Sequence, residues 1–572
     1  MPKDTMDRLT VTVGQYSCAG RKPENQDFHG VSIPEGDALA LKGVVLALAD
    51  GISSSRISRD ASEICVRAMM TDYYDTPEAW TVQSSAETVV KATNAWLHGQ
   101  NSSVDDINSG RVCTLSALVL KGRRGHVIHV GDSRVSRLVG ASLEPLTEDH
   151  RVVLSAEESY LGRAMGADAT VEVDYRAVPL FVGDVFVLST DGVHEHVTGR
   201  VVREAIAGAE TLDAAAEAVA QAALDAGSDD NLTVQIVRVE GLPPEGEALE
   251  TDMARLPLPV LPKAGGMLDG FRILRPVQST ARSHVFLAEG PSGRVALKVP
   301  TQEMAQDAAH LRRFALEEWI ARRVSSSHVV GAVPSGERTA LYVVTEWIEG
   351  VTLRQWMVDH PQPSLDAVRG IVEQIARGLR ALHRREMIHQ DLRPENVMID
   401  AEGTVKIIDL GSCYVAGVEE AAPGTLPQLP GTFQYTAPEY LAGDAASARS
   451  DQFALGVIAY EMLTGRLPYG AQVARVSSRR DVARLSYAPA RAEDNAVPDW
   501  MDAALKKALH PDPFHRYPAL SEFVADLSRP GSVYRAGRHV PLAERNPLRF
   551  WQGVSGVLAV LCVVLIYLLI NQ

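Results

Sequence analysis

The 572-residue sequence is poor in cysteine, and its five cysteines include no CxxC pair. This argues against a disulfide framework and a thiolate zinc site, and it favours a reduced, cytosolic environment. Basic residues are also scarce, since 56 Lys and Arg face 72 Asp and Glu and give a formal net charge of −16. A general nucleic-acid binder needs a basic face, so we expect no nucleic-acid partner. With 46% hydrophobic residues and ordinary glycine and proline usage, the composition is that of a globular protein rather than a disordered or collagen-like one.

Long hydrophobic runs are absent except near the C-terminus. The first ten residues, MPKDTMDRLT, contain no apolar stretch, so we expect no signal peptide. Residues 554–570, VSGVLAVLCVVLIYLLI, are uncharged and as a helix would measure roughly 26 Å, close to the hydrocarbon thickness of a bilayer. A buried core helix is the alternative, but such a helix rarely lacks a polar stripe. The run predicts a transmembrane helix at residues 551–570.

The charges beside this run predict its orientation. Arg545 and Arg549 precede it, which places its N-terminal side in the cytoplasm. No organelle signal is recognisable in the sequence. By analogy, we expect a bacterial protein held at the inner (plasma) membrane by a single pass, with its other domains in the cytoplasm.

A proline- and glycine-rich stretch divides the rest of the chain. Residues 241–267, which begin GLPPEGEALETDMARLPLPVLP, show no sustained hydrophobic period and predict a linker. It separates a block at residues 1–240 from a block at 268–530, each long enough for a core of its own. Residues 531–550 then form a juxtamembrane segment. The fold class expected is multidomain α+β.

In the first block, acidic residues follow short β-rich runs. Residues 44–49, 126–131 and 185–190 each stop at an aspartate, and a fourth aspartate precedes an alternating run; the four are Asp50, Asp132, Asp191 and Asp230. A single Asp-Gly after a strand is usually a turn. Four acids that converge at the strand ends of an antiparallel framework make an all-oxygen site, which suits Mg²⁺ or Mn²⁺. Two such ions can drive in-line attack of a hydroxide on phosphorus.

Five motifs of this block occur in a fixed order. They are Gly20-Arg21-x-x-x-Asn25-Gln26-Asp27, Ala49-Asp50-Gly51, Gly131-Asp132-Ser133-Arg134, Ser189-Thr190-Asp191-Gly192 and Asp230-Asn231. In order and spacing they resemble the metal-dependent (type 2C) Ser/Thr protein phosphatases, from about residue 10 to about 240. The resemblance implies an N-terminal α-β-β-α sandwich that hydrolyses protein phosphoserine and phosphothreonine with two metal ions.

The resemblance also implies which residues hold the metal. Asp50, together with the carbonyl of Gly51, would bridge the two ions. Asp191 and Asp230 would complete the shell of one ion, and Asp27 would act through metal-bound water.

The resemblance also concerns substrate binding, leaves two alternatives for Asp132, and shows two departures from the family pattern. Arg21 would clamp the substrate phosphate with its bidentate fork. Asp132 would either help to hold a weaker third ion or brace the strand-end turn. Ile52 stands where relatives have a second glycine, and the stretch between His150 and Gly162 is short where they have a longer flap. We therefore expect an active phosphatase with altered substrate selectivity.

The second block carries a different series of motifs. They are Val295-Ala296-Leu297-Lys298, Glu317 in FALEEWIARRV, His389-Gln390-Asp391-Leu392-Arg393-Pro394-Glu395-Asn396, Ile408-Asp409-Leu410-Gly411, Ala437-Pro438-Glu439, Asp451 and Arg516. Each has an ordinary explanation alone, such as a solvated lysine or a turn. In this order they resemble the eukaryotic-like Ser/Thr protein kinases to about residue 530. The resemblance implies a bilobal kinase fold that uses ATP and one or two Mg²⁺ or Mn²⁺ ions.

The resemblance also implies the roles of the five central residues. Lys298 would contact the α- and β-phosphates of ATP and pair with Glu317. Asp391 would accept the proton of the substrate hydroxyl, and Asn396 and Asp409 would hold the metal.

Four further residues of this block receive supporting roles from the resemblance. Arg393 stands where relatives use lysine and would offer positive charge to the γ-phosphate. Glu439 and Arg516 are expected to form a structural ion pair, and Asp451 is expected to brace the catalytic loop.

The phosphate loop departs from the kinase pattern. Its three glycine positions, counted back from Val285, are Gln278, Thr280 and Ser283. Gln278 and Val285 would line the nucleotide, but side chains in place of glycine should weaken or reshape ATP binding. Gln390 also replaces an arginine that in relatives pairs with a phosphorylated activation loop, so activity should depend less on that phosphorylation.

These features together predict a membrane-anchored signalling enzyme with two opposing activities on protein Ser/Thr side chains. Its partners would be ATP and protein substrates, including the chain itself, because tethering through the linker gives a high effective concentration. The alternative is an active phosphatase regulated by a nucleotide-sensing pseudokinase module. The lost glycines support that alternative, and the intact Lys298, Asp391, Asn396 and Asp409 oppose it.

Overall fold

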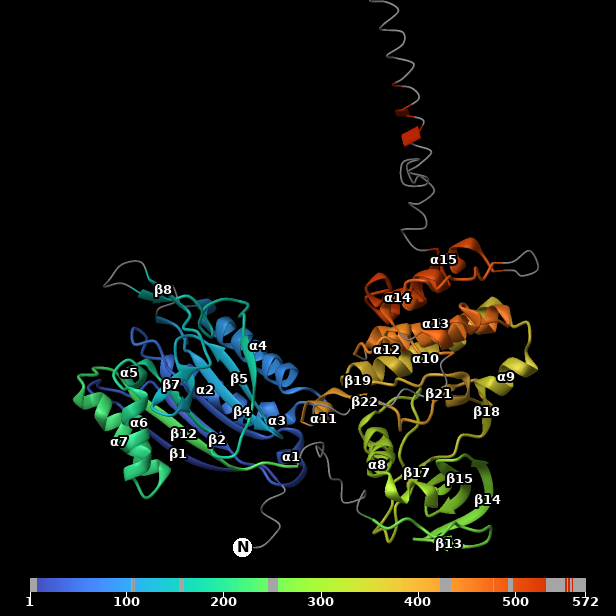
Figure 1. The fold of residues 1–572 in the computed structure, drawn as a ribbon. Coiled ribbons are helices and arrows are strands. Elements are labelled where there is room, and N and C mark those ends of the chain that lie inside the picture. Colours follow the sequence, from blue (N-terminus) through green and yellow to red (C-terminus); the bar gives the residue numbers. More distant parts are fainter. Residues whose placement is uncertain are drawn as a thin grey trace, which may run out of the picture.

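The computed structural model describes most of the chain up to residue 530 and a few residues beyond it. The described residues are 8–530 apart from 104–105, 107–108, 154–158, 245–255, 422–433, 446, 477 and 492–496, together with 551, 552, 554, 555 and 558. Those up to residue 530 form two domains, at residues 8–244 and 256–530 (Figure 1).

Two five-stranded antiparallel sheets make the centre of the N-terminal domain. One has the order β1 (Thr10–Cys18), β12 (Leu232–Gly241), β11 (Val185–Ser189), β6 (Arg134–Val139), β7 (Ser142–Pro145). The other has the order β10 (Asp174–Pro179), β5 (Arg124–Val130), β4 (Leu115–Lys121), β3 (Val44–Ala49), β2 (Phe28–Ser32). Apolar side chains of both sheets pack in one cluster between them, including Leu46, Leu118, Phe186 and Val237.

Helices cover the outer face of each sheet. Val45 and Ala47 of β3 point away from the inter-sheet core and pack under α2 (Ser58–Met70) and α4 (Val82–Gln100). On the other side, α6 (Gly199–Gly208) and α7 (Leu212–Asp225) pack on β11 and β12. Because β3 is buried on both faces, its sequence is continuously apolar rather than alternating. The predicted α-β-β-α sandwich is confirmed. The short elements are α1 (Gly36–Leu41), α3 (Asp72–Asp75), α5 (Asp191–His194), β8 (Arg151–Val153) and β9 (Ser159–Leu161).

The C-terminal domain has two lobes, as predicted. In the first lobe, helix α8 (Ala308–Arg323) packs on a five-stranded antiparallel sheet, β13 (Met267–Leu268), β14 (Phe271–Ser279), β15 (Ser283–Gly290), β16 (Gly293–Pro300) and β17 (Val343–Glu346). The second lobe is mainly helical, with α10 (Leu365–His383) and α13 (Ala448–Thr464) at its centre. Its other helices are α9 (Leu353–Asp359), α11 (Ala416–Ala421), α12 (Pro438–Leu441), α14 (Arg479–Val482), α15 (Asp499–Ala508) and α16 (Leu520–Ser528). Its strands are β18 (Gly350–Thr352), β19 (Met387–Ile388), β20 (Val397–Asp400), β21 (Val405–Ile407) and β22 (Tyr414–Val415).

Part of the predicted linker is attached to the C-terminal domain. The backbone N–H of Leu341 donates to the carbonyl of Pro257 at 2.8 Å, and Gln302 Nε2 donates to the carbonyl of Pro259 at 2.9 Å. Leu256 packs against the small apolar cluster around Phe314. Residues 256–259 therefore lie on the first lobe rather than running freely between the domains.

The predicted transmembrane helix falls almost entirely outside the described residues. Of residues 551–570, only 551, 552, 554, 555 and 558 are described. Within the described part of the chain, no helix combines the length and the apolar character that crossing a bilayer requires.

The two domains contact one another around the short helix α11, which lies between them in Figure 1. Lys121 at the end of β4 donates to the carbonyl of Gly417 in α11 at 2.6 Å. The side chain of Arg323 at the end of α8 reaches Glu78 of the N-terminal domain at 2.6 Å.

Candidate active sites

The strand-end aspartates of the N-terminal domain converge, as predicted. Asp50 follows β3, Asp132 follows β5 by two residues, Asp191 opens α5 after β11, and Asp230 lies just before β12. Burial raises the pKa of Asp50 well above its ordinary value, and the charges of the neighbouring aspartates raise it further. Several carboxylates therefore share one region and repel one another.

Asp50 is held at the end of its strand by Thr114. The backbone N–H of Asp50 donates to Thr114 Oγ1 at 3.0 Å, and the N–H of Thr114 donates to the Asp50 carbonyl at 2.8 Å. The next residue, Gly51, is confined: a Cβ there would lie 2.8 Å from Ser58 Oγ and 3.0 Å from the carbonyl oxygen of Gln26. Only glycine brings the backbone this close to its neighbours.

Asp27 is a buried carboxylate with one uncompensated oxygen. Its Oδ2 accepts from Thr190 Oγ1 at 3.1 Å, while its Oδ1 is buried and has no hydrogen-bond partner among the described residues. Burial raises the pKa of Asp27 to about 7. A buried carboxylate oxygen without a partner is costly, so a cation or a cation-bound water would satisfy it.

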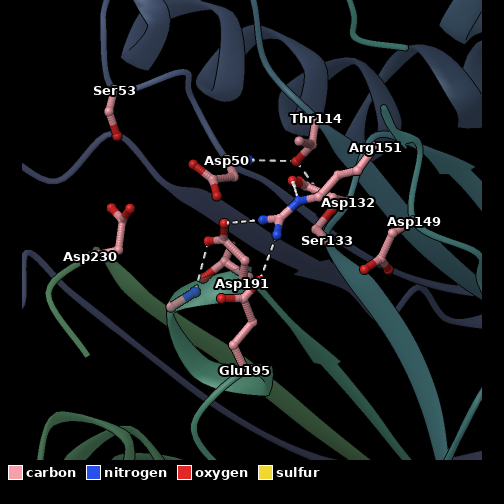
Figure 2. A network of polar contacts seen from close by, with 12 residues as sticks. Asp50, Ser53, Thr114, Asp132, Ser133, Asp149, Arg151, Asp191, Glu195 and Asp230 are labelled. Carbon is pink, nitrogen blue, oxygen red and sulfur yellow. Dashed lines mark hydrogen bonds and ion pairs between the residues drawn. The ribbon is translucent and has the colours of Figure 1, made fainter. Parts of the chain in front are cut away.

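The guanidinium of Arg151, on β8, lies among the carboxylates (Figure 2). It contacts Asp132 through Nε, Asp191 through Nη2 and Glu195 through Nη1, each at 2.6 Å. Burial raises the pKa of Asp191 to about 6, and the charges of Asp132 and Asp230 act in the same direction against that of Arg151. One positive side chain thus forms ion pairs with three carboxylates.

Asp230 is held by a second cation. Lys22 Nζ lies 3.3 Å from Asp230 Oδ2 and donates to Ser53 Oγ at 3.1 Å. The N–H of Asn231 donates to Asp230 Oδ1 at 2.8 Å. The neighbouring Arg21 is an exposed residue of the turn after β1.

The acid cluster fits divalent cations by charge, although its side chains are spread. Within the described residues, no three His, Cys, Asp or Glu side chains stand close enough together to hold an ion as they are. The buried oxygen of Asp27 that lacks a partner and the mutual repulsion at Asp50 are the features that a cation would relieve. The donors are all oxygen, which matches Mg²⁺ or Mn²⁺ rather than zinc.

In the C-terminal domain, Lys298 joins two carboxylates. Its Nζ lies 2.8 Å from Glu317 Oε2 on α8 and 2.9 Å from Asp409 Oδ1. Burial opposes the charge of Lys298, but Asp409 and Glu317 outweigh it and raise the pKa of this lysine. Lys298 in turn lowers the pKa of Asp409, which has a positive φ of 62°. The predicted lysine–glutamate pair is therefore formed.

The catalytic-loop residues are also brought together. Asn396 Nδ2 donates to the Asp391 carbonyl at 2.8 Å and to Asp391 Oδ2 at 3.1 Å. Asp451 accepts from the backbone N–H groups of His389 and Gln390 at 2.9 and 3.0 Å, so its predicted bracing role is confirmed.

Two charged pairs belong to the same lobe, one outside this loop and one inside it. Arg516 and Glu439 form a buried bidentate pair with both N–O distances at 2.7 Å, which confirms the predicted structural ion pair. Arg393 lies within the catalytic loop, between Asp391 and Asn396, and its Nε donates to Glu395 Oε2 at 2.9 Å.

In the hairpin between β14 and β15, the side chain of Thr280 binds the backbone amides of the turn. Thr280 Oγ1 accepts from the backbone N–H groups of Arg282 and Ser283 at 3.2 and 3.0 Å. Thr301 Oγ1 ties the same tip to β16 by donating to the Ala281 carbonyl at 3.0 Å. The amides that a glycine-rich turn would turn toward phosphates are thus used inside this hairpin.

The two side-chain positions expected to line the nucleotide lie beside Lys298 in the sheet. Gln278 pairs with Val285 across β14 and β15, and Val285 pairs with Lys298 across β15 and β16. The three residues are consecutive cross-strand neighbours.

Comparison with known families assigns both regions. Residues 15–232 match the family model described as Protein phosphatase 2C, and residues 282–525 match the one described as Protein kinase domain. The chain joins a protein phosphatase 2C domain to a protein kinase domain. We call them the phosphatase domain and the kinase domain below.

Curated relatives resemble the chain over less than half of its length. It is 30% identical over 264 residues to the serine/threonine-protein kinase PrkC of Bacillus subtilis, covering 45% of this chain and 40% of PrkC. It is 33% identical over 264 residues to PknB of Mycobacterium tuberculosis, covering 44% of this chain and 42% of PknB. The chain thus spans about two fifths of the length of these relatives.

Similar solved structures each cover about two fifths of the chain. PppA of Pseudomonas aeruginosa is 22% identical with a TM-score of 0.35, covering 41% of this chain and 99% of PppA. The catalytic domain of PstP, solved with two manganese ions, is 24% identical with a TM-score of 0.34, covering 41% and 99%.

Two cations of the phosphatase site were not predicted from the sequence. Lys22 adjoins the predicted Arg21, and Arg151 directly follows the Asp149-His150 pair that bounds the short flap. A basic residue next to a predicted acidic site was the available signal. The sequence alone does not place Arg151 near the acids, because its position depends on the pairing of β8 with β9.

Proposed function

We propose that the chain is a bifunctional enzyme that transfers the γ-phosphate of ATP to protein Ser/Thr and hydrolyses protein phosphoserine and phosphothreonine. The observation that carries the proposal is the coexistence of two sites: Lys298 bonded to both Glu317 and Asp409, and Asp50 surrounded by other aspartates. Phosphoryl transfer depends mainly on positioning and charge, and both sites supply these.

In the phosphatase domain, Asp50, Asp191, Asp230 and the Gly51 carbonyl would hold two Mg²⁺ or Mn²⁺ ions, which lower the pKa of bound water. Thr190 orients Asp27 by donating to its Oδ2, which leaves Oδ1 to accept a hydrogen bond in the site.

Side chains around these acids complete the phosphatase site. Lys22 holds Asp230 and partly neutralises it before any ion is bound. Arg21 is exposed and would bind the phosphate of the substrate through two parallel N–H groups.

In the kinase domain, the substrate hydroxyl oxygen forms a bond to the γ-phosphorus while the bond from that phosphorus to the bridging oxygen of ADP breaks. Asp391 accepts the hydroxyl proton, and Asn396 keeps the Asp391 carboxylate in place. Lys298 orients the α- and β-phosphates, and Arg393 adds positive charge near the γ-phosphate. Asn396 and Asp409 would hold the metal that ATP brings.

A pseudokinase module is the second candidate, and one observation favours it. Thr280 uses the hairpin amides that would otherwise face phosphates. We do not prefer it, because the lysine–glutamate pair and the catalytic-loop geometry that transfer requires are formed.

Phosphoryl transfer from labelled ATP with Mg²⁺ or Mn²⁺ tests the kinase assignment. Every sample carries Asp191→Asn, so that the phosphatase does not remove the product. Label on protein that disappears with Asp409→Asn would support a true kinase. A folded protein that binds ATP but incorporates no label in either sample would instead favour the pseudokinase candidate.

Hydrolysis of phosphopeptides tests the phosphatase assignment separately. The wild type should hydrolyse a phosphothreonine peptide with Mn²⁺, and Asp191→Asn should be slower by about a hundredfold or more. Equal rates in the two proteins would refute the assignment.

Membrane attachment through residues 551–570 is part of the proposal, and the uncharged run at 554–570 supports it. Expressed in bacteria, the full chain should sediment with membranes and resist carbonate extraction, whereas a chain ending at residue 550 should not. Full release of the complete chain by carbonate would count against an integral anchor.

A further inference from the structure

The contact between the two domains involves the part of the kinase domain that directly follows its metal-binding triplet. After Asp409-Leu410-Gly411 the chain forms β22 and then α11. The backbone N–H of Gly417 in α11 donates to the carbonyl of Ala79 in the phosphatase domain at 2.8 Å. A Cβ at Gly417 would lie 2.4 Å from the Trp80 carbonyl oxygen, so the two backbones touch.

A fully buried lysine of the phosphatase domain holds the same helix. The side chain of Lys121 has 0% exposure, and its Nζ donates to the Gly417 carbonyl at 2.6 Å and to Glu420 Oε2 at 3.2 Å. A buried lysine is costly unless it is paired and hydrogen-bonded, and here both partners belong to α11. The phosphatase domain therefore binds α11 through a buried positive charge.

The kinase domain in return caps a helix of the phosphatase domain. The N–H of Val82, the first residue of α4, donates to Glu420 Oε2 at 2.9 Å. The N–H of Thr81, the N-cap residue, donates to Glu386 Oε2 at 2.8 Å. Helix starts need acceptors for their free N–H groups and favour negative charge, so each domain completes the other.

One apolar cluster runs through the contact into the kinase active centre. Leu41 and Ala79 of the phosphatase domain pack in a single cluster with Trp319, Ile320 and Leu410. Trp319 and Ile320 lie on α8, the helix that carries Glu317, and Leu410 follows Asp409. Packed side chains thus connect the phosphatase domain to the two segments that carry Glu317 and Asp409.

Within the kinase domain, the residue before Asp391 carries no charge that could bind a phosphate on the activation segment. That residue is the neutral Gln390, whose backbone N–H is bonded to Asp451. A phosphate on the activation segment (residues 409–439) would find no charge at this position. The phosphatase domain supplies fixed contacts to the base of the segment instead.

We propose that the phosphatase domain is a built-in activating partner of the kinase domain. By holding α11 and the end of α8, it keeps Glu317 and Asp409 in place around Lys298 and takes over the task of a phosphorylated activation segment. The inference rests on the proposed kinase activity, and it concerns the docking surface of the phosphatase domain, not its catalytic site.

The test uses the full chain with Asp191→Asn in every sample, so that dephosphorylation does not enter the rates. Glu420→Lys places a positive charge against Lys121 and removes the acceptor for Val82. It should lower the initial rate of phosphoryl transfer by about tenfold. It should also speed amide hydrogen exchange in residues 308–323 and 412–421. Glu373→Arg, a charge reversal on α10 that breaks the surface pair with Arg377, is the matched control and should change neither.

A charge swap keeps the test meaningful if Glu420→Lys disturbs folding. Glu78→Arg and Arg323→Glu each place like charges at the edge of the contact, and the double variant restores opposite charges. Each single variant should slow transfer, and the double variant should recover most of the rate. Mn²⁺-dependent phosphopeptide hydrolysis, measured without Asp191→Asn, reports whether the phosphatase domain remains folded.

Three results would overturn the inference. One is an unchanged rate while exchange shows α11 released, and another is a faster rate, which would make the contact inhibitory. The third is unchanged exchange in all these variants, since the contacts would then not hold the segment. If the unsubstituted protein transfers no phosphate at all, the proposed kinase activity fails. Exchange in residues 308–323 still decides whether docking orders α8.

Discussion

Arg151 Nη2 lies 2.6 Å from Asp191 Oδ2, and the same guanidinium contacts Asp132 at the same distance. The phosphatase site thus contains a cation that belongs to the protein, placed where its acidic side chains would otherwise repel one another. Any divalent ion that uses these two aspartates must compete with a covalently attached positive charge.

Replacing this arginine should strengthen metal binding. In Arg151→Gln, Asp132, Asp191 and Glu195 lose their shared counter-charge, so Mn²⁺ affinity should rise by about tenfold, because a nearby charge is worth roughly 1–4 kcal/mol at a partly buried site. Isothermal titration of the metal-free protein measures this directly. Arg134→Gln is the control, since it breaks an ion pair to Asp149 of similar length. Weaker Mn²⁺ binding by Arg151→Gln would show that the arginine supports the ions instead of competing with them.

A substitution in the hairpin between β14 and β15 should strengthen the binding of ATP to the kinase domain. In Thr280→Gly the amides of Arg282 and Ser283 lose their side-chain acceptor and become available to phosphates. We expect the KM for ATP to fall several-fold, by about 1 kcal/mol of binding for one or two hydrogen bonds to charged oxygens, with kcat nearly unchanged. Steady-state kinetics at varied ATP provides the measurement. A higher KM would mean that Thr280 positions the hairpin for the nucleotide.

The buried Arg516–Glu439 pair should be essential to the second lobe. Arg516→Met leaves Glu439 charged and buried, which should cost about 3–5 kcal/mol of the free energy of unfolding. Urea denaturation followed by fluorescence measures the loss. Arg377→Met, which breaks a surface pair on α10, should cost no more than about 1 kcal/mol. A similar small cost for both variants would contradict the importance of burial.

Lys42 should make the free energy of unfolding increase with pH in the alkaline range. Its ammonium group is buried and bonded to Thr76 Oγ1, the Pro77 carbonyl and Ser85 Oγ, without a carboxylate among these acceptors. Burial lowers its pKa from the ordinary 10.5 to about 7, and the charge of Lys121 acts in the same direction. Between these values the unfolded chain binds more protons than the folded one, so Lys42 should make stability rise with pH, by up to about 1.4 kcal/mol per unit.

Comparison with Lys42→Met isolates this contribution. Thermal or urea unfolding between pH 7 and pH 9.5 should show a steeper rise in stability for the wild type than for the variant. Parallel pH profiles would show that the three oxygen acceptors keep Lys42 charged in the folded protein.

Much of both active sites could be predicted because their residues lie next to regular elements. Asp50 directly follows β3 and Asp191 follows β11 by two residues. These two strands belong to different sheets, and the packing of the sheets against each other brings their ends together. Asp391 and Asn396 are five residues apart in one loop, so their contact is local. Patterns of this range are visible in a single chain.

Contacts between distant segments could not be predicted in the same way. Thr81 and Glu386 are 305 residues apart, and neither stands in a motif that indicates a partner. The helix start at Thr81 was a weak signal, since its N–H groups need an acceptor but any acceptor suffices. The placement of Arg151 similarly depends on the pairing of β8 with β9, which short polar strands specify weakly.

Strand β4 has a consequence for how the two reactions meet. Its Lys121 end touches the kinase domain, whereas Thr114, just before its other end, supports Asp50. Seven residues of strand separate these points by roughly 23 Å. Asp50 therefore lies near the opposite end of the strand from the helix that the phosphatase domain contacts. Phosphate on residues next to α11 is then expected to be removed by a second molecule. The rate of that removal should grow with the concentration of the protein, whereas docking within one chain should not depend on concentration.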